Sequence, residues 1–71
     1  MKKNNKKIFR VWRKMDDRYN GFEEILAMSP REAAEVVFNW DSEVGEFYFD
    51  YEVDLISEFG GDVVENYRII L

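Results

Sequence analysis

The stretch S-P-R-E-A-A-E-V-V-F-N-W at residues 29–40 carries the clearest signal of secondary structure in the chain. Ser29 can accept a hydrogen bond from the third amide of a helix, and Pro30 suits the first helical position, where no donor is needed. Glu32 can return a bond to the cap residue and so complete a capping box. We therefore expect a helix that begins after Ser29 and that Asp41-Ser42 and Gly45 end within about three turns.

The predicted helix is apolar on one side only. Its apolar residues recur at i, i+3, i+4 and i+7, and they are Ala33, Val36, Val37 and Trp40. Arg31, Glu35 and Asn39 fall on the opposite side and are expected to face solvent. A helix with this pattern has to pack its apolar stripe against another layer of the fold.

The segment before the helix predicts strands. K-I-F-R-V-W-R-K-M at residues 7–15 alternates with the period of two that a β-strand requires. One face would carry Phe9, Val11 and Met15, and the other Ile8, Arg10, Trp12 and Lys14. Because Asn20-Gly21 is the favoured dipeptide of a type I′ hairpin turn, a second strand is expected to follow it.

Two loops are possible between these first two strands. A two-residue turn at Asn20-Gly21 would place Tyr19 opposite Phe22, which is a sensible cross-strand pair. The same register places Asp17 opposite Glu24, and this like-charge pair counts against it. The alternative is a longer loop from Asp16 to Gly21.

The last third of the chain predicts a second hairpin. Two segments alternate with a period of two, namely F-Y-F-D-Y-E-V-D-L-I-S at residues 47–57 and V-V-E-N-Y-R-I-I-L at residues 63–71. A three-residue loop at Gly60-Gly61-Asp62 keeps the apolar faces together and places Arg68 opposite Asp54. A two-residue loop would oppose Val53 to Arg68 and mix the faces, so we expect the three-residue loop.

The predicted elements run strand, strand, helix, strand, strand. One helix packed on one face of a four-stranded, mainly antiparallel sheet would bury both apolar surfaces, so we expect a two-layer α+β domain. Residues 1–6 are polar and lack an apolar period, which predicts a disordered basic tail. Residues 7–71 would then form a single domain, because 71 residues are too few for two cores.

Composition narrows the possible classes of function. The chain is 46% hydrophobic and 17% aromatic, as a folded protein should be, and it contains no Cys and no His. Thiol nucleophiles, imidazole bases and the usual zinc ligands are therefore missing. Ser29, Ser42 and Ser57 have no such base to activate them, so we expect no catalytic residues, no cofactor and no enzyme activity.

Charge is divided unevenly along the chain, whose formal net charge is −5. Residues 1–18 hold eight basic and two acidic groups, a net charge of +6, whereas the rest holds two basic and thirteen acidic groups, a net charge of −11. Nine acids and no basic residue lie between Asp41 and Glu65. We interpret this acidic stretch as the surface that meets a partner.

Asp50, Glu52 and Asp54 alternate along one predicted strand, so their carboxylates would form a row with a spacing of about 6.6 Å. A row does not converge as the oxygen ligands of a bound cation do, and we expect no metal site. The row can instead imitate the phosphates that a basic groove binds. The alternative is an ordinary solvated strand face, partly neutralised by Arg68.

These patterns predict a non-catalytic inhibitor that blocks a basic nucleic-acid-binding groove of a host nucleic-acid-handling protein. The predicted partner-binding residues are Trp12, Tyr48, Asp50, Glu52, Asp54, Glu58, Asp62 and Glu65. Trp12 or Tyr48 would supply the apolar anchor, because aromatic side chains dominate binding hot spots. Both rings are left on the open face of the sheet if Phe9 and Val11 face the helix, whereas with the faces of the first strand reversed Trp12 lies in the core.

Two other functions stay open. A homodimer could form through the open sheet face or an edge strand, and nucleic acid could bind the first strand through Arg10, Arg13 and Trp12. The net charge of −11 over the rest of the chain opposes direct nucleic-acid binding, so we do not expect it. The apolar run at residues 8–12 is too short for a signal peptide or a membrane span, which predicts a cytoplasmic protein without membrane contact.

A short N-terminal strand pair, the segment A-M-S-P-R-E-A-A-E at residues 27–35 and an acidic C-terminal hairpin form a layout that is seen elsewhere. It resembles small accessory proteins of phages and mobile elements, in particular anti-CRISPR and anti-restriction inhibitors. Such families imply stoichiometric inhibitors that block a nucleic-acid-binding groove, often with acidic side chains. The resemblance covers residues 8–71 as a pattern and assigns no role to an individual residue.

Overall fold

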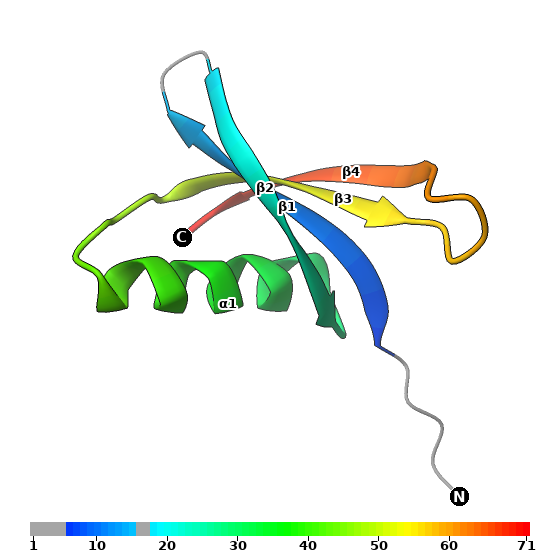
Figure 1. Cartoon of the computed structure of the whole chain (residues 1–71), viewed down its shortest axis with the longest axis horizontal. Helices are drawn as coiled ribbons and strands as arrows, with labels where there is room; N and C mark the ends of the chain where they lie inside the picture. The colour runs from blue at the N-terminus through cyan, green and yellow to red at the C-terminus, as the bar shows by residue number, and fades with distance from the viewer. Residues whose placement is uncertain (1–5, 16–17) are drawn as a thin grey trace, which may run out of the picture.

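The computed structural model describes residues 6–15 and 18–71 and contains, within them, one helix and one four-stranded sheet. The elements along the chain are β1 (Lys7–Met15), β2 (Arg18–Ala27), α1 (Pro30–Glu43), β3 (Asp50–Ile56) and β4 (Val63–Ile70). The helix α1 covers one face of the sheet and leaves the other open (Figure 1). The predicted α+β class with one antiparallel sheet is confirmed. The predicted tail at residues 1–6 lies, apart from Lys6, outside the described residues.

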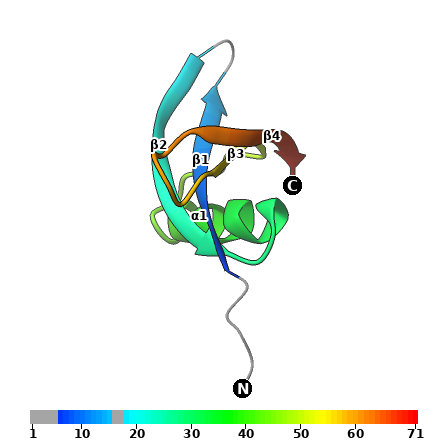
Figure 2. The same ribbon diagram turned by 90° about the vertical axis from the view of Figure 1, so that its right-hand side faces the viewer.

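The sheet has the strand order β2-β1-β3-β4, and each neighbouring pair is antiparallel. The strand β1 therefore joins the two hairpins, and its Val11 lies opposite Glu23 of β2 and opposite Val53 of β3. Because the sheet is twisted, the two hairpins cross each other steeply, as Figure 1 and Figure 2 show. The strands β2 and β4 are left as the two edges of the sheet.

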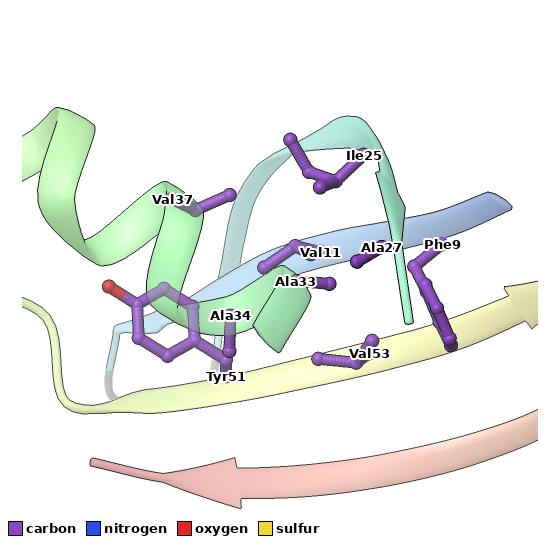
Figure 3. Close-up of a cluster of buried hydrophobic side chains, with 9 residues drawn as sticks. All are labelled: Phe9, Val11, Ile25, Ala27, Ala33, Ala34, Val37, Tyr51 and Val53. Atoms are coloured by element: carbon purple, nitrogen blue, oxygen red, sulfur yellow. The ribbon is translucent and has the colours of Figure 1, made fainter. Parts of the chain in front are cut away.

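The hydrophobic core lies between α1 and the covered face of the sheet (Figure 3). Its members are Phe9, Val11, Ile25, Ala27, Ala33, Ala34, Val37, Tyr51 and Val53. As predicted, Phe9 and Val11 face the helix, and the alternating side chains of β1 therefore lie on the open face. Ala33 and Ala34 have only a Cβ atom between the helix backbone and the sheet, so α1 can approach the strands closely.

The helix begins as the sequence predicts. Ser29 Oγ accepts a hydrogen bond from the Glu32 amide at 3.1 Å, and Pro30 occupies the first helical position. The return bond of the capping box differs, because Glu32 Oε2 accepts from the amide of Met28 at 3.3 Å rather than from the cap residue. The helix ends before Gly45 but continues through Asp41 and Ser42 to Glu43, so its 14 residues make about four turns rather than the expected three.

The predicted apolar stripe of α1 is rotated in the structure. Trp40 is 50% exposed, whereas Ala34 and Asp41 are buried in its place. In this orientation Asp41 faces Arg13 on β1 and binds its guanidinium. A prediction from hydrophobic periodicity places every aspartate on the solvent side of a helix. It could not show that Asp41 pairs with Arg13, which lies 28 positions away in the chain.

The predicted turn at Asn20-Gly21 is wrong, because both residues lie inside β2. The pairing of β1 with β2 shifts by one residue between Trp12 and Lys14, which places an extra residue in β2. Gly21, with a φ of 72°, lies in this bulge. A positive φ suits a glycine bulge as well as a type I′ turn. The longer-loop alternative is also wrong, and the connection falls at residues 16–17, outside the described residues.

The predicted register of β3 and β4 is wrong as well, although its faces are right. Arg68 lies opposite Glu52 rather than opposite Asp54, which is a slip of two residues. A slip of two keeps every side chain on its own face, so the hydrophobic pattern alone cannot detect it. The connection spans residues 57–62 and not the predicted residues 60–62.

A largely buried ion pair fixes the helix to the sheet. Arg13 binds Asp41 through two hydrogen bonds, from Nε to Oδ2 at 2.6 Å and from Nη2 to Oδ1 at 2.8 Å, and donates to Glu23 at 3.2 Å. The hydrogen bonds to Asp41 raise the pKa of Arg13 further above its already high value. This cluster joins the last turns of α1 to both β1 and β2.

Tyr51 lies beneath α1 and makes the stability of the core depend on pH. Its ring is fully buried, its hydroxyl points toward the helix (Figure 3), and the hydroxyl has no hydrogen-bond partner among the described residues. Burial raises the pKa of Tyr51 from 10.0 to about 12. The folded state therefore holds this proton more tightly than the unfolded state does. The resulting stability is complete below pH 10 and is lost as the pH rises toward 12.

Urea unfolding at about pH 9 and about pH 11.5 measures this effect. We expect the unmodified chain to lose stability between the two values and the Tyr51→Phe variant to lose distinctly less. At neutral pH the variant should be at least as stable as the unmodified chain, because no hydrogen bond is removed. An equal alkaline loss in both proteins would show that another group causes it.

Candidate functional site

The nine acids between positions 41 and 65 do not form one surface. They fall into four groups. Asp41 is buried, and Glu43 and Glu46 lie at the C-terminal end of α1 and just after it. Asp50, Glu52 and Asp54 form the row on the open face, and Glu58, Asp62 and Glu65 lie at the far end of β3 and β4. The helix end and the β3–β4 connection lie at opposite ends of the molecule (Figure 1). Each group therefore has to be judged by its own contacts.

The open-face row is already bound by side chains of the same chain. Arg68 donates to Asp50 from Nε at 3.1 Å and from Nη2 at 2.7 Å, and this bond lowers the pKa of Asp50. Asp54 accepts from Trp12 Nε1 at 3.0 Å and from Asn66 Nδ2 at 2.7 Å. These contacts match the alternative interpretation of the row, a polar strand face that Arg68 partly neutralises.

The end of the β3–β4 hairpin carries three further acids, Glu58, Asp62 and Glu65. We call this region the tip and define it by its exposed residues, Glu58, Phe59, Asp62, Val63, Val64 and Glu65. Phe59 is 87% exposed, more than any other large apolar residue that the structure describes. The three tip carboxylates form no ion pair with any residue in the ranges 6–15 and 18–71.

Hydrogen bonds within the loop explain why the tip projects from the sheet. Ser57 Oγ accepts from the Phe59 amide at 3.1 Å and donates to the Phe59 carbonyl oxygen at 3.0 Å. The Ser57 amide also donates to the carbonyl oxygen of Asp62 at 2.8 Å. Gly60 and Gly61 have φ values of 97° and 72°, which suit glycine, and they complete the reversal of the chain. The loop is thus closed by its own bonds and holds Phe59 outside the core.

The first residues of β4 complete the shape of the tip. The pairing of β3 with β4 shifts between Leu55 and Ile56, which makes Val64 an extra, unpaired residue. Tyr67 donates a hydrogen bond to Glu65, and this bond raises the pKa of Tyr67. One tip carboxylate is therefore oriented from the strand, whereas the other two are positioned by the loop alone.

The two rings predicted as anchors lie away from the tip. Trp12 is on the open face, as expected, where it packs against Phe22 with ring centroids 4.8 Å apart and donates to Asp54. Tyr48 packs partly buried against the core, so its expected position on the open face is wrong. Sequence analysis missed Phe59 because a single ring between two strands has no periodicity. The expected loop at residues 60–62 left Phe59 inside the strand, whereas β3 ends at Ile56.

The arginines of β1 are occupied by carboxylates of the same chain. Arg13 is held by Asp41 and Glu23, and Arg10 Nε lies 3.6 Å from Glu24 Oε2. A phosphate that approached β1 would have to displace these carboxylates first. Both arginines of β1 therefore have acidic neighbours in the same chain, whereas the tip carboxylates form no ion pair with a described residue.

The tip is suited to recognition, because an exposed ring in a loop whose carboxylates form no ion pair complements a surface that is cationic and partly apolar. No group of three or more acidic side chains among the described residues is arranged to hold a metal ion. Within the same ranges, no helix combines the length and the apolar character needed to cross a membrane. Comparisons with protein-family models, with curated proteins and with solved structures found no match to this chain.

Proposed function

We propose that this chain is a non-catalytic binding protein that inhibits a nucleic-acid-handling protein of its host by occupying that protein's basic surface. One observation supports the proposal above all: Phe59 is 87% exposed in the β3–β4 connection that also carries Glu58 and Asp62, and neither carboxylate forms an ion pair with a described residue. A groove that binds phosphates carries lysines and arginines, which would form ion pairs with these carboxylates. The working surface in this proposal is the tip and not the row on the open face.

The ring and the carboxylates of the tip would contribute in different ways. Full burial of a phenylalanine side chain is worth about 1.5–3 kcal/mol, so Phe59 would supply much of the affinity. The carboxylates would accelerate the encounter with a basic groove and select against acidic surfaces. The internal bonds of Ser57 hold the loop in place before binding, which reduces the entropy lost on association.

Inhibition follows from competition for one groove. A bound tip would occupy the volume that nucleic acid needs and would neutralise the cations that hold its phosphates. Nucleic acid and this chain should both bind the groove more weakly as salt rises, because salt screens the charge attraction on which both depend. Nucleic acid and this chain should therefore exclude each other from the partner in a salt-dependent manner.

Capture from a lysate of the host in which the chain is made tests this proposal. The chain is immobilised, the lysate is applied at low salt, and bound proteins are challenged first with duplex DNA, then with RNA and finally with high salt. We expect a specific protein that nucleic acid releases before salt does. The proposal fails if the captured proteins bind no nucleic acid, or if saturating nucleic acid leaves them bound.

Removing the exposed ring gives a more specific prediction. The Phe59→Ala variant should bind the captured protein more weakly by about tenfold or more, because an aromatic hot spot is worth about 2 kcal/mol or more. Its melting temperature should not change, since the ring lies outside the core. The matched control is Phe47→Ala, which removes another ring, 59% exposed, elsewhere on the molecule. Equal losses of affinity in the two variants would contradict the assignment of Phe59 as the anchor.

A further inference from the structure

The edge strand β4 lacks protection that the edge strand β2 has. Both lie at the ends of the strand order, where backbone groups are available to another strand. A bulge at Gly21 interrupts β2, and Glu23 and Glu24 add charge to it. The strand β4 carries Glu65 and Arg68, and its bulge lies only at its beginning, so residues 65–70 form an uninterrupted edge. Its apolar residues that are more than half exposed are Val63, Val64 and Ile70.

The hydrogen bonds to β3 determine which backbone groups of β4 face outward. The amide of Leu71 donates to the carbonyl oxygen of Phe49 at 2.8 Å, in line with the register of the two strands. Bonded and non-bonded pairs alternate along antiparallel strands, so Tyr67 also directs its backbone groups toward β3. The N–H and C=O groups of Asn66 and Ile70 then point to the outer edge.

We propose that β4 pairs with β4 of a second copy of this chain, antiparallel, in the register that places Tyr67 opposite the second Tyr67. The two sheets would join into one sheet of eight strands, with both helices on the same face. This surface shares Val63 and Val64 with the tip but does not include the anchor Phe59, and the proposal does not depend on the proposed function. It rests on the outward-facing edge of β4 and on the fit of this strand to itself.

Side chains select this register among the available ones. With Tyr67 at the centre, Asn66 lies opposite Arg68 of the second copy. Val64 and Val63 lie opposite Ile70 and Leu71 of the second copy. A relative shift of two residues in one direction places Arg68 directly opposite the second Arg68. A shift in the other direction places Asn66 opposite itself and brings Val64 beside Arg68. Only the Tyr67-centred register avoids both conflicts.

A shallow groove beside the end of β4 fits the same arrangement. It has a volume of about 430 Å³, and its lining residues are Arg31, Glu35, Phe38, Asn39, Phe49 and Leu71. Leu71 forms its rim next to β4. In the proposed register the second copy brings its Val63 and Val64 to this rim, so apolar surface that each copy exposes would be covered by the other.

Sedimentation equilibrium over a wide concentration range tests the pairing. We expect a monomer–dimer equilibrium that strengthens as salt rises, because each copy carries a net charge of −5. Ile70→Lys on β4 should weaken dimerisation by about tenfold or more, since Lys on an edge strand blocks pairing. The matched control Leu26→Lys places the same charge on β2, where Leu26 is 63% exposed and Ile70 is 61% exposed. A monomer at every concentration, or a dimer that only the control disrupts, overturns the proposal.

Single cysteines test the register in a chain that has none of its own. Opposed residues of a non-bonded antiparallel pair have Cα atoms about 4.5 Å apart, within reach of a disulfide. Mild oxidation should therefore link two copies of the Tyr67→Cys variant and leave the Glu24→Cys variant on β2 unlinked. The reverse result contradicts the register. Tip binding should weaken with salt whereas the dimer should strengthen, so failure of one proposal is distinguishable from failure of the other.

Discussion

Replacing Asp41 by alanine should unfold most of the chain at room temperature. Asp41 is 6% exposed and holds Arg13 through hydrogen bonds of 2.6 Å and 2.8 Å. Alanine would leave a largely buried guanidinium with Glu23 alone, and removal of one partner from a buried ion pair costs about 3–5 kcal/mol. A domain of this size has a total stability of about 3–5 kcal/mol. The far-ultraviolet circular dichroism of Asp41→Ala should therefore resemble that of an unfolded chain.

The controls for this prediction separate the buried pair from the charge itself. Arg13→Met combined with Asp41→Leu should restore the folded spectrum, because a buried ion pair can be replaced by apolar residues of similar volume. Glu23→Gln should cost less than about 1 kcal/mol, since the Glu23 carboxylate is half exposed. If Asp41→Ala unfolds at the same urea concentration as the unmodified chain, the ion pair is not what holds α1 on the sheet.

Some parts of this fold are determined locally and were predictable. The helix start at Ser29 depends on four consecutive residues, and the faces of β1 and β3 depend on a period of two. The positions of the turns were not predictable in the same way. Gly21 supplies a positive φ that a bulge uses as readily as a turn, and a two-residue slip of Arg68 against Glu52 leaves every hydrophobic face unchanged.

The candidate site, too, was predictable from the sequence only in part. The acidic stretch was visible in the sequence, but the acids that remain without an ion pair depend on which strands are neighbours. The place of β1 between β2 and β3 brings Trp12 against Asp54, and the rotation of α1 brings Asp41 against Arg13. Phe59 is exposed because the connection between β3 and β4 spans residues 57–62, whereas the expected register gave a loop of residues 60–62 only. Such contacts between distant segments have no signature in a single sequence.

Reversing two charges at the tip should abolish binding to the captured partner. The variant combines Glu58→Lys with Asp62→Lys, which removes two attractions to a basic groove and adds two repulsions. We expect the Kd to rise by about 100-fold or more, because disrupting one desolvated charge pair already costs about 2–5 kcal/mol. Stability should be unchanged, since neither carboxylate forms an ion pair with the described residues. Thermal unfolding and circular dichroism check that the variant is folded.

The most direct test of the tip compares this variant with Glu43→Lys combined with Glu46→Lys, by calorimetric titration against the captured partner. Each exchange adds two charges, so both double variants carry −1 instead of −5, but the control pair lies at the opposite end of the molecule. If the tip is the working surface, the tip variant loses binding and the control stays within about threefold of the unmodified Kd. Equal losses, or a tip variant that binds as tightly as the unmodified chain, would contradict it.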